Sequence, residues 1–470
     1  MVVTIGRNIR VTDPTDELIK WCDENLVIRN PDYIKKQRMN FWLGKTPEWL
    51  HLYEWDGGVL VLPFGTCREV YTMFIRSDSS VNVLFKKNHD IERVNYNAHV
   101  PLYDYQQLAV DAMFAKRCGI LQSKAGSGKT QMGIALVAMY GQRALWLTHT
   151  HDLLLQSKER AEQYMDPSLI GTITAGKVNI GKGITFATVQ TMANLDLPSY
   201  RDIWNVIIVD ECHRVAGTPT AMTQFGKVLN NLCAAHKYGL SATVHRADGM
   251  IKATFAYLGN VAYTVPDEAV ADKVMQVKVD MVETAYDIDR RSLNPDGTIN
   301  YTAMIENLCG NYDRNKLIAD KIAENAGHSQ LILSARISQL ERIRELLPDE
   351  LFEKYALITG KMTTKVGMAE RKAAIEQMRT GEKTVLFATY NLCKEGLDVP
   401  RLDRLYLASP QTDYAVITQS VGRIARTAPD KEQPVCYDFV DTVVGYLARA
   451  YKKRCTTYKK IGCEFKRLKK

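Results

Sequence analysis

The stretch Ile120-Leu121-Gln122-Ser123-Lys124-Ala125-Gly126-Ser127-Gly128-Lys129-Thr130 decides how this 470-residue chain folds. It opens as a short apolar strand, passes through a glycine-containing loop and leads into residues 131–140, where apolar side chains recur at helical spacing. In such a loop the backbone N–H groups turn inward and the helix N-terminus adds partial positive charge, so the arrangement predicts a phosphate site. The residues expected to bind nucleotide phosphates are Ala125, Gly126, Ser127, Gly128, Lys129 and Thr130.

Lys129 and Thr130 have separate tasks in a loop of this kind. The lysine can reach the β- and γ-phosphates, and the threonine hydroxyl can bind Mg²⁺. The general pattern begins with glycine, where this chain has Ser123, so the loop taken alone could be a plain turn before a buried helix. The strand before the loop and the helix after it favour the phosphate site.

A second candidate site follows a continuous apolar strand at residues 206–209. The strand delivers Asp210-Glu211-Cys212-His213 at its carboxyl end, where ligands bind in open α/β sheets. We expect Asp210 to hold Mg²⁺ and Glu211 to orient or deprotonate the attacking water. His213 is placed to hydrogen-bond toward the next strand and to relay the state of the nucleotide. A merely solvent-exposed acidic pair is the weaker alternative, because a phosphate loop precedes it.

Two arginines lie near the other end of the chain, in the segment 419–426. Arg423 and Arg426 are three residues apart, and we expect both on one face of a helix. An arginine can stabilise the charge on the γ-phosphate oxygens during phosphoryl transfer. An ordinary surface pair is the alternative, and the phosphate loop and acidic pair favour the catalytic interpretation. Hydrolysis would then depend on the closure of two domains.

Short apolar runs alternate with helical segments in two series, which indicates two parallel sheets covered by helices. The first series follows residue 101, and the second follows the polar stretch 287–300. The strands expected in the first sheet are 143–148, 184–188, 206–209 and 237–240. Those expected in the second are 330–334, 355–358, 384–388, 404–408 and 434–439.

Residues 1–97 have a different pattern. A strand over 2–9, a helix over 15–26 and a β-hairpin that turns at Asp56-Gly57-Gly58 predict a small α+β domain.

The net charge of +8 is concentrated at the other end of the chain. Residues 449–470 contain ten Lys and Arg against one acid, so they carry +9 and the rest sums to about −1. Tyr451, Tyr458 and Phe465 interleave with these charges. The segment predicts electrostatic contact with phosphates, and a solvated, frayed tail is the alternative.

The composition excludes several classes of protein. No apolar run approaches the ~20 residues of a membrane helix, and residues 1–10 lack the apolar core of a signal peptide. The expected compartment is the cytoplasm, or the host cytoplasm if the protein is viral. The ten cysteines form no C-x-x-C pair, so we expect neither structural zinc nor an iron–sulfur cluster.

Together with several smaller motifs, these segments resemble the superfamily 2 helicases over about residues 100–442, in the order of that family. The smaller motifs are Tyr105-Gln106, 145–156, 188–191, Ser241-Ala242-Thr243, Ala335-Arg336 and 389–399. The resemblance implies an α/β fold class, with two tandem RecA-like parallel-sheet domains and a small N-terminal α+β accessory domain. The expected domains are 1–97, the DNA-binding accessory domain; 98–265, the ATP-binding domain; 266–445, the second RecA-like domain; and 446–470, a basic tail.

The same resemblance implies roles for single residues. Gln106 would read adenine, and the ATP contacts of the second domain would be Gly396, Asp398, Arg423 and Arg426. The residues implied in coupling ATP state to strand movement are His213, Ser241, Thr243 and Gln419. Those implied in nucleic-acid contact are Thr148, His149, Thr150, Thr188, Gln190, Arg336 and Thr389.

Within the superfamily, residues 239–249 and Asp210-Glu211-Cys212-His213 are similar to segments of DNA branch-migration and repair helicases. The compact size with a small N-terminal domain resembles phage-encoded branch-migration helicases. This implies a monomeric helicase that uses ATP and Mg²⁺ on single-stranded, forked or four-way DNA in recombination, repair or replication. Three alternatives stay open. They are a translocase that moves on duplex DNA without separating strands, an RNA helicase, and a nucleotide-switched clamp that binds nucleic acid without moving.

Overall fold

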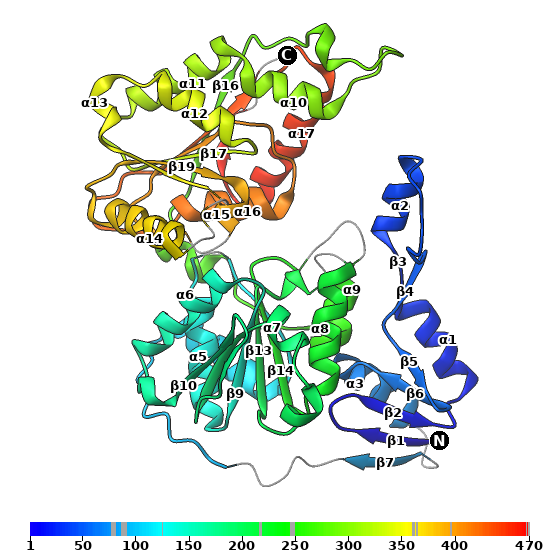
Figure 1. Ribbon diagram of the computed structural model, residues 1–470. Coiled ribbons are helices and arrows are strands. Elements are labelled where there is room, and N and C mark those ends of the chain that lie inside the picture. Colours follow the sequence, from blue (N-terminus) through cyan, green and yellow to red (C-terminus); the bar gives the residue numbers. More distant parts are fainter. Residues whose placement is uncertain are drawn as a thin grey trace. The chain divides into compact units, whose positions relative to one another are not determined.

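The computed structural model divides into two compact units, Met1–Lys124 with Gly128–Ala269 and Ala125–Ser127 with Val270–Lys470 (Figure 1). The residues that the structure describes are 1–76, 81–85, 92–124, 126–215, 219–244, 250–359, 362, 365–394, 397–466 and 468. No helix within these ranges is both long enough and apolar enough to span a bilayer.

The first unit begins with an N-terminal lobe built on a five-stranded sheet of order β5-β6-β2-β1-β7. The elements of the lobe are β1 (Val2–Ile5), β2 (Ile9–Thr12), α1 (Asp16–Asn25), β3 (Val27–Arg29), α2 (Pro31–Arg38), β4 (Trp49–His51), β5 (Glu54–Asp56), β6 (Val59–Leu62), η1 (Phe64–Thr66), α3 (Cys67–Val70), η2 (Tyr71–Ile75) and β7 (Asn82–Phe85).

The single strand expected over residues 2–9 is wrong, because the chain reverses there. β1 and β2 are antiparallel, and the Gly6 N–H donates to the Asn8 carbonyl at 3.0 Å in the turn between them. Alternate residues continue to face the core across this turn, so the period of two hides it. The buried residues on the two strands are Val3, Ile5, Ile9 and Val11.

The other two expectations for the lobe are confirmed. The helix expected over 15–26 is α1, and the hydroxyl of Thr15 accepts the Leu18 N–H at its N-terminus. The expected hairpin is β5 and β6, joined by Gly57 and Gly58 at φ values of 56° and 81°. Two residues with positive φ are what a tight hairpin turn requires.

The rest of the first unit is built on an eight-stranded sheet of order β11-β10-β12-β9-β13-β14-β8-β15, parallel except for β11. Its strands are β8 (Gly119–Gln122), β9 (Ala144–Thr148), β10 (Ile170–Thr174), β11 (Lys177–Asn179), β12 (Ile184–Thr188), β13 (Val206–Asp210), β14 (His236–Ser241) and β15 (Val261–Thr264). Its helices are α4 (Asp104–Lys116), α5 (Lys129–Tyr140), α6 (His151–Glu162), α7 (Val189–Ala193), α8 (Pro219–Asn231) and α9 (Ile251–Leu258), which flank the sheet in Figure 1. The four strands predicted after the phosphate loop are confirmed as β9, β12, β13 and β14.

The second unit has a seven-stranded sheet of order β18-β19-β17-β20-β21-β16-β22. Its strands are β16 (Lys278–Glu283), β17 (Gln330–Ser334), β18 (Tyr355–Ile358), β19 (Val385–Thr389), β20 (Arg404–Leu407), β21 (Val435–Val440) and β22 (Glu464–Phe465). Its helices are α10 (Tyr301–Gly310), α11 (Tyr312–Glu324), α12 (Ile337–Glu345), α13 (Asp349–Phe352), α14 (Lys365–Thr380), α15 (Tyr390–Lys394), α16 (Tyr414–Ile424) and α17 (Gly445–Lys460). All five predicted strands are confirmed, but the sheet does not begin after the polar stretch 287–300. It includes β16, whose alternation of charged and apolar residues differs from the apolar runs of the other strands.

The basic segment 446–466 packs onto the core of this second unit, so the frayed-tail alternative does not hold for it. In α17 the guanidinium of Arg454 donates to Asp438 at 2.8 Å and the hydroxyl of Tyr458 donates to the same carboxylate at 2.9 Å. All three side chains are buried. The opposite face of α17 is exposed, and its lysines are Lys452, Lys453, Lys459 and Lys460.

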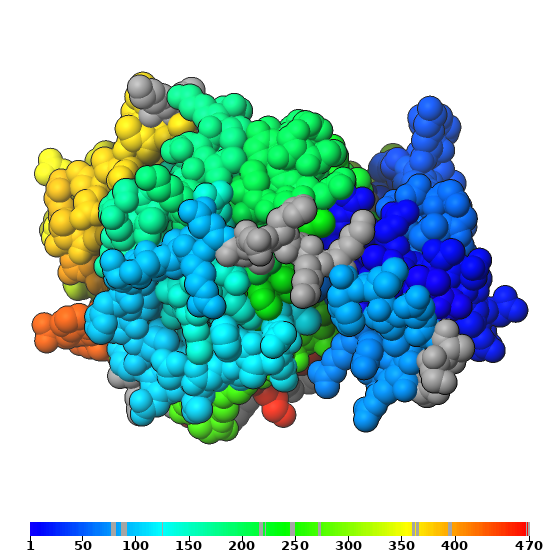
Figure 2. All heavy atoms as spheres, turned by 90° about the horizontal axis from the view of Figure 1, so that it is seen from below, coloured from blue at the N-terminus to red at the C-terminus, as the bar shows by residue number. Residues whose placement is uncertain are grey.

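The N-terminal lobe packs closely on α9, and Figure 2 shows it beside the rest of the first unit. Gly65 in η1 lies directly on the backbone at the end of α9. A Cβ at this position would be 2.3 Å from the Gly259 nitrogen and 2.4 Å from the Phe255 carbonyl oxygen. Any larger residue would therefore separate the lobe from the helix.

Lys237 in β14 lies at the same junction and is completely buried. Its ammonium donates to the carbonyl oxygens of Arg7 at 2.8 Å and Leu229 at 2.6 Å. It also lies 4.9 Å from the ring centroid of Phe64. Lys237, a residue of β14, thus binds the turn between β1 and β2.

Burial lowers the pKa of Lys237 from 10.5 to about 7. Between these values the unfolded chain holds a proton that the folded chain has released, so stability rises with pH, by at most about 1.4 kcal/mol per pH unit. We expect the midpoint temperature of thermal unfolding to rise more between pH 7 and about pH 9 in the wild type than in Lys237→Met. Calorimetry at the two pH values measures this rise. Lys177→Met, at an exposed site, should respond as the wild type does, and an equal response of Lys237→Met would contradict the lowered pKa.

Candidate functional site

The predicted phosphate loop joins β8 to α5 in the first unit. Gly126 and Gly128 have φ values of 87° and 82°, a backbone region that favours glycine. A Cβ at Gly128 would lie 2.3 Å from the Nε2 atom of Gln106, so the glutamine amide packs directly against the loop. The structure thus brings Gln106 to the loop from 22 positions earlier in the chain.

The first turn of α4 fixes the position of Gln106. Its Oε1 atom accepts the Tyr103 N–H at 3.0 Å, and the side chain is buried. The rings of Tyr103 and Tyr105 stack with centroids 5.9 Å apart beside it. An oriented amide next to a phosphate loop is suited to reading the edge of a base, as the resemblance implies.

The acidic strand end holds a buried carboxylate. Asp210 accepts hydrogen bonds from the Ser157 hydroxyl at 3.2 Å and from the Glu211 N–H at 2.9 Å. Burial raises the pKa of Asp210 to about 6, the charge of Glu211 adds to this shift, and the nearby ammonium of Lys129 opposes it. Lys129 and Asp210, predicted from separate motifs, therefore share one site. Sequence analysis missed Ser157, because no spacing in α6 distinguishes it.

Glu211 has a left-handed backbone, with φ 47° and ψ 50°. Such a conformation is uncommon and costs free energy for a residue other than glycine, and it occurs often at functional sites. His213 lies next in the chain of contacts, with its Nδ1 atom 3.3 Å from the Glu211 carboxylate and 3.1 Å from the Ser241 hydroxyl. The hydrogen bond that we predicted from His213 toward the next strand is present.

The hydrogen-bond partners of Ser241 decide the tautomer of His213. The Ser241 hydroxyl donates to the Thr243 carbonyl at 2.7 Å and accepts the Thr243 N–H at 3.1 Å. Its one hydrogen is therefore used, so the Nδ1 of His213 must be the donor in their contact. A continuous chain of polar contacts runs from Glu211 through His213 and Ser241 to Thr243.

The nucleic-acid residues expected in the first unit gather at the carboxyl edge of its sheet. Thr148 and Thr188 are register partners at the ends of β9 and β12. Behind them, the Gln190 amide lies 3.2 Å from the Nδ1 atom of His149, and the Thr150 hydroxyl caps α6. Burial lowers the pKa of His149, and the nearby Arg214 and His213 lower it further. Of these five residues, called the ledge below, Thr148 and Thr188 are buried and His149, Thr150 and Gln190 are half-buried.

The second unit has a corresponding edge. Arg336 follows β17 and occupies the N-cap position of α12, and Thr389 ends β19. Ser334 pairs in register with Thr389, so the two predicted contact residues lie at adjacent strand ends.

The expectation that both arginines share a helical face is wrong. α16 ends at Ile424, and Arg426 lies beyond it, in a bridge with Val274. The carbonyl of the C-cap residue, Ala425, accepts the Met275 N–H at 2.7 Å. The two arginines still converge on one short segment. Arg423 donates to the Leu397 carbonyl at 3.0 Å, and Arg426 forms an ion pair with Asp398.

Some predicted residues lie outside those that the structure describes. They are Ala125 in the phosphate loop, Gly396 in the second domain and residues 245–249 after the Ser241 motif. Gln419 is described, in α16, on the same helix as Arg423.

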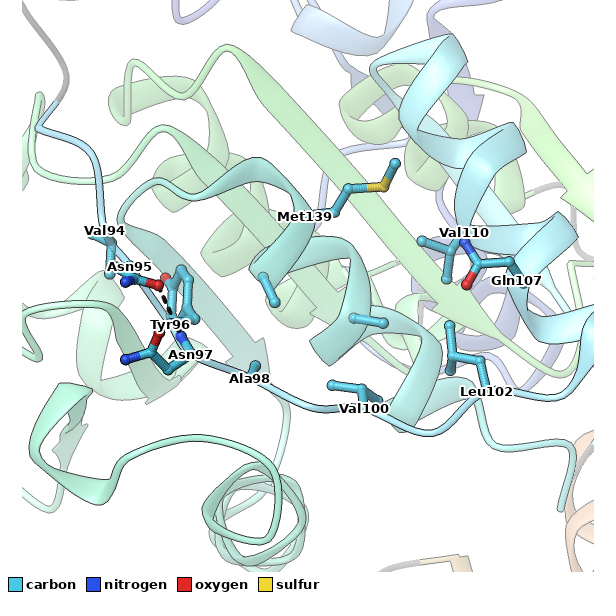
Figure 3. A pocket seen from close by; sticks show the side chains of 12 residues that line it. Val94, Asn95, Tyr96, Asn97, Ala98, Val100, Leu102, Gln107, Val110 and Met139 are labelled. Carbon is cyan, nitrogen blue, oxygen red and sulfur yellow. Dashed lines mark hydrogen bonds between the residues drawn. The ribbon is translucent and has the colours of Figure 1, made fainter.

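The first unit also has a cavity of about 480 Å³ under the linker between the N-terminal lobe and α4 (Figure 3). The linker residues Val94 to Leu102 form one wall, and Val110 and Met139 from α4 and α5 line it too. Its lining contains none of the predicted site residues. No group of three or more His, Cys, Asp or Glu side chains in the described part of the chain could hold a metal ion.

Two family models match this chain in the order of its two sheets. "Type III restriction enzyme, res subunit" matches residues 99–246, and "Helicase conserved C-terminal domain" matches residues 313–428. Together they span more than half of the chain and contain both strand-edge sites. The chain belongs to the superfamily 2 helicases.

Curated relatives of this helicase come from viruses and cells. It is 27% identical over 350 residues to a putative ATP-dependent RNA helicase of Acanthamoeba polyphaga mimivirus, a match that spans 73% of this chain and 64% of that protein. It is 26% identical to a probable helicase of Escherichia phage T5, over 68% of this chain and 67% of that protein. It is 27% identical to the DNA 3'-5' translocase XPB2 of Sulfurisphaera tokodaii, over 71% of this chain and 80% of that protein.

Solved structures share the fold of the helicase. A fragment of a putative HsdR subunit of a type I restriction enzyme from Vibrio vulnificus has a TM-score of 0.54 at 20% identity, over 75% of this chain and 67% of that one. Saccharomyces cerevisiae Dbp5 bound to RNA and ADP BeF3 has a TM-score of 0.53 at 18% identity, over 78% and 89%. The two helicase domains imply that the chain uses ATP and acts on nucleic acid.

Replacement of Gly128 by alanine should weaken nucleotide binding by the helicase. The new Cβ would meet the amide of Gln106, and a positive φ would add roughly 1–3 kcal/mol of backbone strain. We expect the affinity for a fluorescent ATP analogue to fall by about ten-fold or more, as measured by titration. Gly176→Ala is the matched control, since Gly176 has a φ of 75° but nothing within 4 Å of a Cβ. An unchanged affinity in Gly128→Ala would contradict the position of Gln106 against the loop.

Proposed function

We propose that this helicase hydrolyses ATP with Mg²⁺ to move along DNA and to unwind or branch-migrate forked and four-way junctions in recombination, repair or replication. It acts as a monomer in the cytoplasm, or in the host cytoplasm if the chain is viral. The observation that supports this best is the continuous polar chain from Glu211 to Thr243, which joins the acidic strand end to the next strand end.

In the proposed site, Lys129 and the loop residues bind the phosphates and Glu211 orients the attacking water. Asp210 and Thr130 supply oxygen ligands of the kind that Mg²⁺ prefers, and such sites usually combine one or two carboxylates with substrate phosphates. The buried Asp210 carboxylate beside Lys129 fits this use. When bound, the ion would neutralise charge on the phosphates. Arg423 and Arg426 of the second unit would stabilise the charge that develops during transfer.

Two groups of polar residues at strand ends are proposed to bind the nucleic acid. They are the ledge around Thr148 and Thr188 in the first unit and the pair Arg336 and Thr389 in the second. Hydroxyl, amide and guanidinium groups at strand ends suit contacts with phosphates, which carry no sequence information. Movement on any sequence is what a motor requires.

DNA is favoured over RNA by the sequence Asp210-Glu211-Cys212-His213 and by the relative named as a DNA 3'-5' translocase. That relative also supports a second candidate function, translocation on duplex DNA without strand separation. The mimivirus relative, named as a putative RNA helicase, supports the RNA alternative. Strand displacement and triplex displacement, measured on the same preparation, separate unwinding from duplex translocation.

Glu211→Gln tests the proposed mechanism. The amide cannot accept a proton, so we expect nucleic-acid-stimulated ATP hydrolysis to fall roughly 10²- to 10⁴-fold while ATP binding is kept. Hydrolysis is measured with single-stranded, forked and four-way DNA and with RNA of the same sequence. Glu162→Gln, in a surface pair with Lys158, is the control and should hydrolyse ATP as the wild type does. Hydrolysis retained in Glu211→Gln would remove this residue from its role, and greater stimulation by RNA would contradict the DNA assignment.

The exposed lysines of α17 are proposed to bind DNA phosphates. Removal of the whole segment would leave Asp438 buried without Arg454, so substitution is the better test. We expect Lys452→Gln, Lys453→Gln, Lys459→Gln and Lys460→Gln in one protein to flatten the plot of log affinity against log salt. The slope should become shallower by about 0.9 for each phosphate of the duplex that the variant no longer neutralises. Lys316→Gln with Lys354→Gln, elsewhere on the second unit, is the control, and an unchanged slope would show that α17 does not bind DNA phosphates.

A further inference from the structure

The N-terminal lobe has an arm whose helix, α2, is not part of its core. β3 and β4 pair as an antiparallel ribbon, and residues 30–48 between them form α2 and a loop (Figure 1). α2 buries none of its residues, whereas a helix that stabilises a fold normally buries one face. The residues at the end of the arm, 31–48, are called its head below.

The head exposes large aromatic side chains. Trp42 is 88% exposed, more than any other large apolar residue in the described part of the chain, and Phe41 beside it is 62% exposed. The indole of Trp42 lies against Gly44, where a Cβ would be 3.0 Å from the ring. Gly44 has a φ of 53°, so the glycine both permits the turn and leaves room for the ring.

The charge of the arm is positive. Residues 27–51 contain five Lys and Arg against two acids. One acid, Glu48, is already paired with Arg29 at 3.0 Å. Lys35, Arg38 and Lys45 are exposed, and among the described residues no carboxylate forms an ion pair with them.

Hydrogen bonds hold the head in one conformation. The buried side chain of Asn30 accepts the Asp32 N–H at 3.0 Å and donates to the Pro47 carbonyl at 2.8 Å, which ties the two ends of the head together. Lys36 donates to the Thr46 hydroxyl at 2.7 Å and ties α2 to the loop. A surface ordered in advance loses less entropy when it binds a partner.

We propose that the head of the arm binds unpaired bases of the nucleic acid, with Trp42 and Phe41 stacking on bases and Lys35, Arg38 and Lys45 contacting phosphates. This inference rests on the proposed function, in that the partner is nucleic acid. Aromatic faces stack on any base, and the cations suit a polyanion. Duplex DNA offers no free base face along its length, so the arm recognises the single strands at a fork or junction. It acts apart from the strand-edge residues.

Trp42→Ala in the full chain tests the proposal. Stacking is worth about 1–3 kcal/mol per base, so affinity for single-stranded and forked oligonucleotides should fall roughly ten-fold, as measured by fluorescence anisotropy. Trp42→Phe should keep most of the affinity, and all variants should bind blunt duplex equally. The matched control is Trp55→Ala, because Trp55 is a half-exposed tryptophan of the same lobe outside the arm.

The possible outcomes test the role of the arm separately from the proposed function. Equal affinities of Trp42→Ala and Trp55→Ala for single strands would overturn the proposal, and so would an equal loss on blunt duplex. Trp42-dependent binding to phosphatidylserine vesicles with unchanged DNA affinity would assign the head to membranes instead. ATP hydrolysis by the wild type is measured with the same oligonucleotides. A lack of stimulation contradicts the proposed function, whereas the arm is judged by affinity alone.

Discussion

One buried carboxylate constrains the architecture of the first unit. Asp210 ends a strand whose other residues are all apolar and buried, and a charge in that position is costly unless hydrogen bonds and an opposite charge surround it. The Ser157 hydroxyl, the Glu211 N–H and the ammonium of Lys129 provide them. They come from α6, from the residue after β13 and from the start of α5. A parallel sheet with helical crossovers brings these segments to one edge, so the fold and the site satisfy the same requirement.

The neighbouring residue links this edge to the next strand. Glu211 is held in a left-handed conformation by its surroundings, and its contact with His213 continues to Ser241 and Thr243. These contacts join the acidic strand end to the end of β14. Such a connection is what the proposed coupling between ATP state and strand movement would use.

The sequence predicted most of the central strands because they are short, continuous apolar runs between glycine, polar and helical segments. It predicted which residues gather at the candidate site because the residues of each motif lie within a few positions of one another. It failed where partners are distant in the chain. Nothing near β16 indicates that it pairs with β21, and nothing near Ser157 points to Asp210. The buried pair of Arg314 and Asp441, at 2.8 Å, involves residue types that usually lie at the surface, so sequence pattern could not reveal it. Arg426, just past the end of α16, forms a bridge with Val274, which is equally remote.

The short strand β22 has a consequence for how the second sheet behaves in solution. Without it, the outer edge of β16 would present unpaired N–H and C=O groups, which can template pairing with another copy of the chain. β22 covers Lys278 and Val279 of that edge, and the ring of Phe465 packs against Tyr458 at 5.9 Å, which fixes it to α17. At the start of β16, then, the last described strand covers part of the sheet edge, and a cut just before it would leave the backbone groups of Lys278 and Val279 open to pairing with another copy of the chain.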